Sequence, residues 1–208
     1  MSHHTPTLSD HDVLTHAREG LGQHLPLQAE GYKCTTDDLL NVRLGVAANR
    51  GRLEAVCRDL VGTPEAATIR NDFNEPLCVE DLPDLARRFN AALADEIPLR
   101  VWRQACDVAM DFQDRPYYGE MPQATGVWVR SRARDGTTRF YRGATAYVML
   151  KDLRVTLAIP FVLPEDETVT VVQDLQKALK KLKRRVGCLF LDKGFAGMAV
   201  IAYLERQG

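Results

Sequence analysis

A strand, helix and strand in succession constrain the fold of this 208-residue chain most strongly. Residues 153–163 (LRVTLAIPFVL) and 186–192 (VGCLFLD) are apolar runs of strand length, and residues 167–185 between them have the periodicity of an amphipathic helix. A passage of this kind implies a parallel neighbour in a mixed sheet that is covered by helices. The helix places Val169, Val172, Leu175, Leu179 and Leu182 on its apolar side and Lys177, Lys180, Lys181 and Arg184 on the other.

Other segments of the same region also have strand patterns. Residues 107–112 (DVAMDF) form a short strand candidate. Residues 126–134 and 137–150 flank Asp135-Gly136, which is a strong signal for a two-residue hairpin turn. A last helix is expected just past Gly194. The predicted order is strand, strand, strand, helix, strand, helix, with one additional strand in the first hairpin.

Residues 35–98 have helical patterns instead. Thr36 is a candidate N-cap, and the Gly-Thr-Pro sequence at 62–64 predicts that one helix ends and another begins. This is the outline of a helix-turn-helix. Two interpretations remain open: the pair reads DNA, or it packs in an ordinary small bundle.

Three segments follow from these patterns. Residues 1–34, which contain all five histidines in their first part, are predicted to be flexible. Residues 35–98 are predicted to form a helical domain that ends at Pro98. Residues 99–208 are predicted to form the mixed sheet with its flanking helices. The fold class is therefore α+β or α/β.

The two halves of the chain differ in charge. Up to Pro98 there are 9 Lys and Arg against 16 Asp and Glu, net −7, whereas from Leu99 onward there are 18 against 12, net +6. A basic half suggests a polyanionic partner, although random sampling of surface charge can produce such a split. The longest apolar stretch, at 155–163, is too short for a membrane helix, so we expect a cytoplasmic protein without a membrane partner.

Two aspartates lie at the ends of predicted strands. Asp111 is near the end of the first strand and Asp192 closes the strand after the crossover helix. If these strands are parallel neighbours, both carboxylates reach one edge of the sheet. Mg²⁺ or Mn²⁺ would relieve their repulsion, since both ions prefer oxygen ligands. The alternative is that each aspartate caps the following loop through backbone N–H groups.

Three stretches together resemble insertion-sequence transposases of the DDE class, which have a ribonuclease-H-like catalytic core. They are DVAMDFQDRPYYG, GTTRFYRGATAYVMLKDLRVTLAI and VGCLFLDKGFAGMAVIAYL. The resemblance extends over about residues 35–208 and implies that Asp111 and Asp192 are the first two members of the metal-binding triad. It selects Asp111 over Asp107 and Asp114, which lie in the same stretch.

The resemblance also implies a third acid, a Glu on a helix after a further strand. Glu205 and Glu120 do not occupy such a place. We therefore expect a truncated transposase with a partial ribonuclease-H-like core and little or no DNA strand cleavage and transfer by itself. The alternative is a module that binds DNA or full-length transposase and inhibits transposition without catalysis.

Basic residues complete the hypothesis. We expect insertion-sequence ends and target DNA as partners, with self-association or full-length transposase as a further partner, and a nucleoid-associated location. Arg130, Arg132 and Arg134 alternate along one strand and are expected to share a face. The candidate DNA-binding residues are Arg130, Arg132, Arg134, Lys177, Lys180, Lys181, Arg184 and Lys193.

Overall fold

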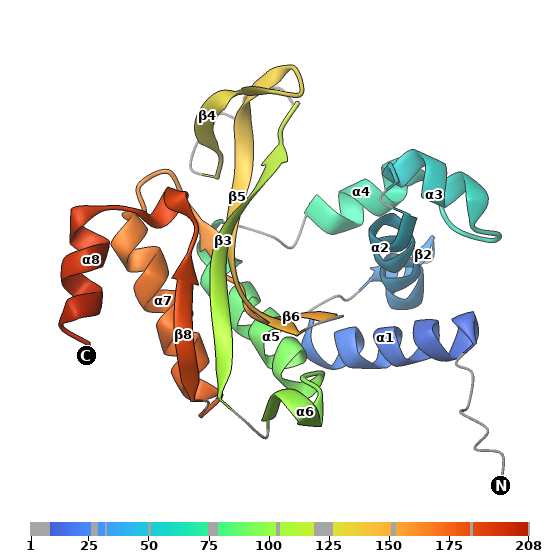
Figure 1. Cartoon of the computed structure of the whole chain (residues 1–208). Helices are drawn as coiled ribbons and strands as arrows, with labels where there is room; N and C mark the ends of the chain where they lie inside the picture. The colour runs from blue at the N-terminus through green and yellow to red at the C-terminus, as the bar shows by residue number, and fades with distance from the viewer. Residues whose placement is uncertain are drawn as a thin grey trace, which may run out of the picture. The chain divides into compact units, whose positions relative to one another are not determined.

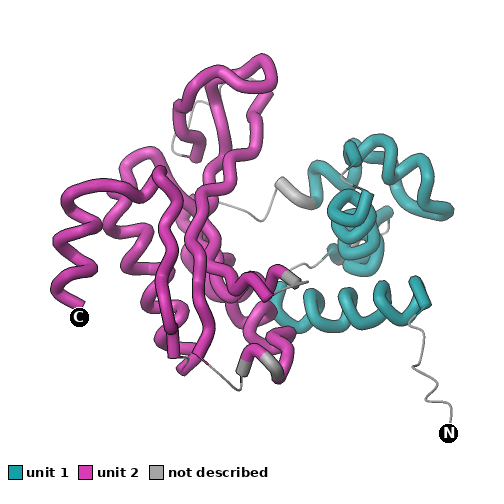
Figure 2. Tube along the Cα trace, viewed as in Figure 1, with its two compact units in different colours: residues 1–78 teal, residues 79–208 magenta. Residues whose placement is uncertain are grey.

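The computed structural model describes residues 9–25, 29–31, 33–49, 51–74, 79–102, 105–118, 127–150, 153–183 and 185–207. The chain divides into two compact units, Met1–Cys78 and Val79–Gly208 (Figure 2). Each unit has a hydrophobic core of its own and is described separately. Within the described ranges, every helix is too short or too polar to cross a bilayer.

The first unit consists of short helices and one small antiparallel pair of strands (Figure 1). Its core is built from Cys34, Leu39, Val42, Val56, Cys57 and Ile69. Burial is the main reason why the pKa of the Cys34 thiol is raised to about 12. The elements are α1 (Asp10–His24), β1 (Glu30–Gly31), β2 (Cys34–Thr35), α2 (Thr36–Asn49), α3 (Leu53–Asp59) and α4 (Ala66–Asn74).

Local hydrogen bonds explain two differences from the expected boundaries. The segment predicted to be flexible contains helix α1. A capping box between Ser9 and Asp12 stabilises the start of this helix: the Asp12 N–H donates to Ser9 Oγ (3.2 Å) and the Ser9 N–H donates to Asp12 Oδ2 (2.9 Å). The same arrangement starts α2, where Thr35 and Asp38 exchange bonds of 3.2 and 2.8 Å. Thr35, one residue before the predicted Thr36, is therefore the cap.

Helices α3 and α4 form the predicted helix-turn-helix outline. Gly62 lies in the turn with φ 77°, a left-handed conformation that glycine adopts without steric cost. Helix α4 begins at Ala66, slightly later than the Thr63-Pro64 start that the sequence suggests. The two short helices joined by a tight turn are confirmed, and both interpretations of the pair stay open.

The second unit is built on a mixed sheet. Strand β5 lies in its middle, antiparallel to β3 on one edge, and carries β4, β7 and β6 in turn along the other edge. Strand β8 pairs with the far side of β3 in parallel. The strands are β3 (Cys106–Pro116), β4 (Val129–Arg134), β5 (Thr137–Leu150), β6 (Leu153–Ala158), β7 (Phe161–Val162) and β8 (Val186–Leu191).

The turn between β4 and β5 is the predicted two-residue hairpin. Asp135 and Gly136 both have positive φ, 54° and 78°, as a type I′ turn requires, and Arg134 pairs with Thr137 across it. The two-residue turn predicted at Asp135-Gly136 is confirmed.

Helices supply the core of one sheet face. Val108 and Met110 on β3 alternate with residues that face the other side, and they pack with Ala144 and Ala146 on β5 into a core closed by residues of α7 such as Leu175. The helices of this unit are α5 (Leu82–Asp95), α6 (Leu99–Trp102), α7 (Thr168–Lys181) and α8 (Met198–Glu205), with short 3-10 turns η1 (Val79–Asp81) and η2 (Lys193–Phe195). The expected combination of helices with a mixed sheet is confirmed.

Helix α5 belongs to this second unit. The strand predicted over 153–163 breaks at Ile159-Pro160, and Asn90 of α5 binds the exposed backbone there: its Nδ2 donates to the Ile159 carbonyl (3.0 Å) and its Oδ1 accepts from the Ile159 N–H (2.8 Å). Proline has no N–H for a sheet ladder, which explains the break. The units therefore divide at Cys78 and not at Pro98.

The C-terminal segment also differs in detail. The helix expected just past Gly194 begins at Met198, because residues 193–195 form the turn η2 first. Phe195 of this turn is fully buried and stacks on Phe112 of β3, with ring centres 4.1 Å apart and planes 9° from parallel.

We expect the substitution Phe195→Ala to lower the free energy of unfolding by about 3–5 kcal/mol, because it removes a buried ring from the core. Urea denaturation followed by circular dichroism measures this change. Phe190→Ala is the matched control, since Phe190 is 58% exposed, and it should change stability by no more than about 0.5 kcal/mol. Equal losses for the two variants would show that the Phe112–Phe195 stack does not stabilise the unit.

Candidate metal centre

The register of β3 with β8 places the two aspartates side by side. Val108, Ala109 and Met110 pair with Leu189, Phe190 and Leu191, so the next positions along the two strands are Asp111 and Asp192. The Asp192 N–H donates to the Met110 carbonyl at 3.1 Å, which continues the ladder to this point. Neighbouring strands lie about 4.8 Å apart, and paired residues point to the same face. The prediction that these strands are parallel neighbours is confirmed.

Asp111 is half-buried within β3. Its Oδ2 accepts a hydrogen bond from Gln113 Nε2 at 3.1 Å, and Gln113 lies two residues along the same strand and hence on the same face. Its backbone carbonyl accepts from the Thr145 hydroxyl at 3.4 Å. Gln113 therefore restrains one carboxylate oxygen of Asp111 and leaves the other oxygen without a hydrogen bond from the described residues.

Asp192 is exposed and follows the last residue of β8. It is the N-cap of η2, where its Oδ2 accepts from the Gly194 N–H at 3.5 Å. This bond is at the long limit for an amide donor. The capping role expected as the alternative is thus present, and it occupies only one oxygen of the carboxylate.

Packing on the other side of the sheet holds Asp192 in place. A Cβ atom on Gly194 would lie 3.0 Å from the Phe112 ring, so glycine lets η2 close against β3. The Phe112–Phe195 stack then fixes this turn to the strand that carries Asp111. The two acids are therefore positioned by a shared ladder and a shared aromatic contact.

The pair has the chemistry of a hard-cation site. Two carboxylates next to each other repel, and within the described ranges neither has a Lys or Arg partner. Divalent Mg²⁺ and Mn²⁺ favour such oxygen donors. In the described part of the chain, no three His, Cys, Asp or Glu side chains gather as ligands. The chemistry of Asp111 and Asp192 is that of two carboxylate ligands for such an ion.

The neighbouring acids of β3 have other partners. Asp107 Oδ1 accepts from the Cys188 N–H at 3.0 Å, where the β3–β8 register shifts. Asp114 binds Arg142 through two bonds of 2.7 and 3.0 Å and has only 13% of its side chain exposed. These contacts give Asp107 and Asp114 structural roles and leave Asp111 as the acid of β3 that lies beside Asp192.

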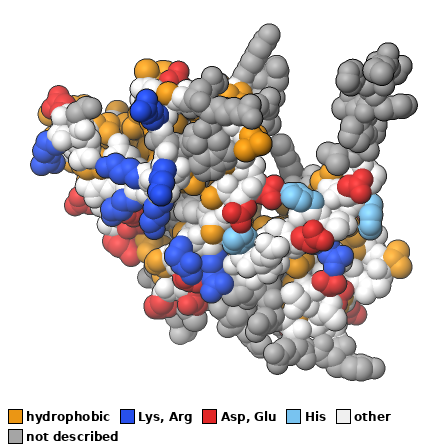
Figure 3. Space-filling model, turned by 90° about the horizontal axis from the view of Figure 1, so that it is seen from below, with side chains coloured by type: hydrophobic (Ala, Val, Ile, Leu, Met, Phe, Trp, Pro, Cys, Tyr) orange, Lys and Arg blue, Asp and Glu red, His pale blue; other side chains and the backbone are white. Residues whose placement is uncertain are grey.

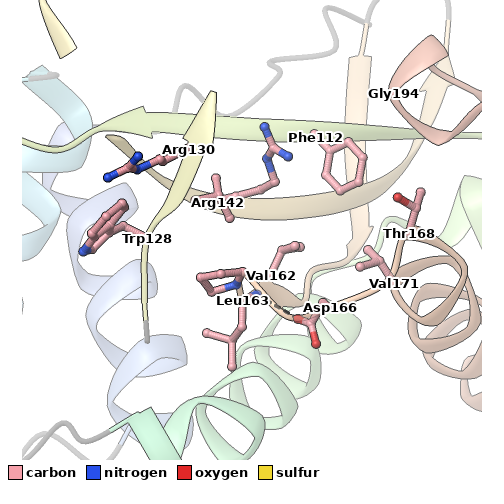
Figure 4. A pocket seen from close by; sticks show the side chains of 12 residues that line it. Phe112, Trp128, Arg130, Arg142, Val162, Leu163, Asp166, Thr168, Val171 and Gly194 are labelled. Atoms are coloured by element: carbon pink, nitrogen blue, oxygen red, sulfur yellow. Dashed lines mark hydrogen bonds between the residues drawn. The ribbon is translucent and has the colours of Figure 1, made fainter. Parts of the chain in front are cut away.

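A pocket of about 760 Å³ lies near this site without containing the two acids. Its lining includes Phe112 and Gly194 together with Arg130, Arg142 and Asp166 (Figure 4). Phe112 is on the opposite side of β3 from Asp111 by the alternation of the strand. The pocket and the acid pair are therefore separate features.

The three arginines of β4 have different surroundings. The β4–β5 register shifts between Arg130 and Arg134. As a result Arg130 lies over the Trp128 ring (5.9 Å to its centre), whereas Arg134 lies over the buried Phe140 ring (5.1 Å) and 3.6 Å from Asp114. Arg132 between them is exposed. Their strand partners Arg139 and Thr137 lie on the same side of β5, and the expected common face of the three arginines stays a prediction.

The lysines of α7 lie away from the acid pair. Buried residues of α7 pack on the sheet face opposite the aspartates, and Lys177, Lys180 and Lys181 are exposed. Lys177 pairs with Asp174 (2.9 Å). Lys and Arg side chains gather on part of the molecular face in Figure 3. Lys193 is also exposed beside Asp192, and Arg184 lies outside the described residues.

Two residues near the candidate sites were not predicted. Gln113 lies two positions after Asp111, and this spacing was a usable signal for a shared strand face. Arg139 pairs with Arg130 across the hairpin, but the register shift hides this pairing from the sequence. The sequence predicted that Asp111 and Asp192 are neighbours, but it did not predict the bond from Gln113 to Asp111.

The chain matches no family model, no curated protein and no solved structure with which it was compared.

Proposed function

We propose that this chain has a metal site for phosphodiester chemistry on DNA in the manner of a DDE transposase, with little or no strand cleavage and transfer by itself. The observation that carries the proposal is the pairing of Asp111 with Asp192 on adjacent parallel strands, on one face of the sheet. Acids at that edge of a sheet are typical ligands for the hard cations of phosphoryl-transfer sites.

The topology supports a partial ribonuclease-H-like core. An antiparallel series β3, β5 and β6 is followed by the crossover helix α7 and by β8, which returns beside β3. The sequence resemblance to insertion-sequence transposases implies the same arrangement. Because fold likeness alone does not establish activity, the acid pair and not the sheet carries the functional argument.

Each residue of the site has a defined part in this proposal. Asp111 and Asp192 would hold Mg²⁺ or Mn²⁺, and Gln113 would orient the Asp111 carboxylate through its bond to Oδ2. A bound divalent ion would supply activation of a water and stabilisation of the charge on the leaving oxygen. Orienting groups around a ligand commonly raise metal affinity.

Two carboxylates are a partial ligand set, so cleavage by this chain alone should be weak or absent. Two-metal phosphodiester chemistry needs further oxygen ligands to clamp both the attacking and the leaving groups. A second candidate function follows from this limit: a module that binds DNA ends or a full-length transposase and blocks transposition. The arginines of the β4–β5 hairpin favour DNA binding under both functions.

Asp111→Asn and Asp192→Asn should each weaken Mn²⁺ binding by about 10-fold or more, since each removes one anionic ligand. Titration of the free Mn²⁺ signal by electron paramagnetic resonance measures this affinity. Asp107→Asn is the matched control, because Asp107 has the same charge on the same strand but bonds to the Cys188 N–H. Equal Mn²⁺ affinity of wild type and Asp111→Asn would refute the site.

Nicking of supercoiled plasmid distinguishes the two functions. A residual enzyme should produce slow nicking that requires Mn²⁺ or Mg²⁺ and disappears in Asp111→Asn, with Asp107→Asn retaining it. Plasmid binding without any metal-dependent nicking would favour the inhibitory module. Nicking that persists equally in Asp111→Asn would indicate a contaminating nuclease and would count against catalysis by this site.

A further inference from the structure

Two arginines meet over one indole in the β4–β5 hairpin. Arg130 and Arg139 are directly opposite each other in the register of the two strands. Their guanidinium carbons lie 5.9 and 5.4 Å from the centre of the Trp128 ring. Figure 4 shows Arg130 and Trp128 next to each other on the same side of the pocket.

This arrangement concentrates positive charge, with no counterion among the residues that the structure describes. Like charges directly opposite each other destabilise a strand pair, and contact with an indole offsets only part of that cost. Neither arginine has a carboxylate partner among the described residues, whereas Arg134 and Arg142 share Asp114. Arg130 is exposed and Arg139 is half-buried, so both guanidinium groups can reach a ligand. An anion between them would remove the repulsion.

Arg139 follows the same strand alternation as Thr145, whereas Arg130 and Trp128 line the pocket on the Phe112 side of β3. Thr145 of β5 is the strand partner of Asp111, and the pairing of β3 with β5 is regular from there to Pro116 and Phe140. The Tyr117 N–H continues this pairing by donating to the Arg139 carbonyl. Arg139 therefore faces the same side as Thr145. Six residues of strand separate them, which corresponds to about 20 Å at 3.4 Å per residue.

We infer that Arg130 and Arg139, held over Trp128, form a clamp for a backbone phosphate of DNA. Guanidinium groups bind phosphate oxygens through planar paired hydrogen bonds, and contact with an indole restrains the position of those donors in advance. Trp128 itself is 8% exposed, so it serves as the platform for the arginines and not as a stacking surface for a base. The identity of the ligand as DNA rests on the proposed function.

Binding of the full chain to a fluorescent duplex of about 30 base pairs, measured by anisotropy in EDTA across a series of salt concentrations, tests the clamp. The double variant Arg130→Gln/Arg139→Gln should bind about 10-fold more weakly at low salt, with a salt slope shallower by about 1 to 2. The variant Arg130→Lys/Arg139→Lys keeps the charge but loses the planar stacking. It should still bind about 3-fold more weakly, with little change of slope.

The control removes two charges elsewhere in the same unit. Arg87 and Arg88 on α5 are ion-paired with Asp84, and their double change to Gln should leave affinity within about 2-fold. Equal losses in the clamp and control variants would overturn the clamp, because bulk charge would then explain binding. Full affinity of the Lys variant would likewise overturn the role of the indole platform.

Two further arms separate the sources of phosphate and the two proposals. Inorganic phosphate at matched ionic strength should not displace the duplex; displacement at low millimolar phosphate would assign the clamp to a small anion and overturn the DNA assignment. Asp111→Asn should bind the duplex as wild type does in EDTA. Failure of Asp111→Asn to lose Mn²⁺ would remove the proposed function, while failure of the clamp variants to lose DNA would remove only the clamp.

Discussion

The parallel pairing of β3 with β8 is the constraint on which the rest of the second unit depends. Helix α7 joins the antiparallel part of the sheet to β8, and its apolar side fills the core under β3 and β5. Hydrogen bonds from the Cys106 N–H to the Arg185 carbonyl (3.2 Å) and from the Asp192 N–H to the Met110 carbonyl (3.1 Å) mark the two ends of the ladder. A slip of one residue would put Asp111 and Asp192 on opposite faces, and the candidate site would not exist.

The two faces of the sheet have separate tasks. One face gives the unit its stability through Met110, Leu175, Phe195 and the other core residues. The other face carries Asp111 with Asp192.

Periodicity made the second unit predictable from sequence. The amphipathic pattern of 167–185, the apolar runs beside it and the Asp135-Gly136 turn each determine local structure, and together they lead to the parallel strands and the paired aspartates. Features that depend on tertiary contacts were not predictable. One is the hydrogen bonding of Asn90 to the Ile159 backbone, which assigns α5 to the second unit. Another is the register shift that places Arg139 opposite Arg130. The spacing of Ser9 and Asp12 was a usable signal for the start of a helix, but the polar character of the segment favoured the prediction of a flexible terminus.

In the proposed site, Asp111 and Asp192 jointly bind one divalent ion. A crystal of the full chain grown with Mn²⁺ tests it directly, through the anomalous difference density collected near the manganese edge. We predict a peak that contacts an oxygen of each carboxylate, at a distance of about 2.0–2.6 Å typical of hard cations and oxygen ligands. Manganese bound elsewhere, with the two carboxylates separated or turned to different faces, would contradict it.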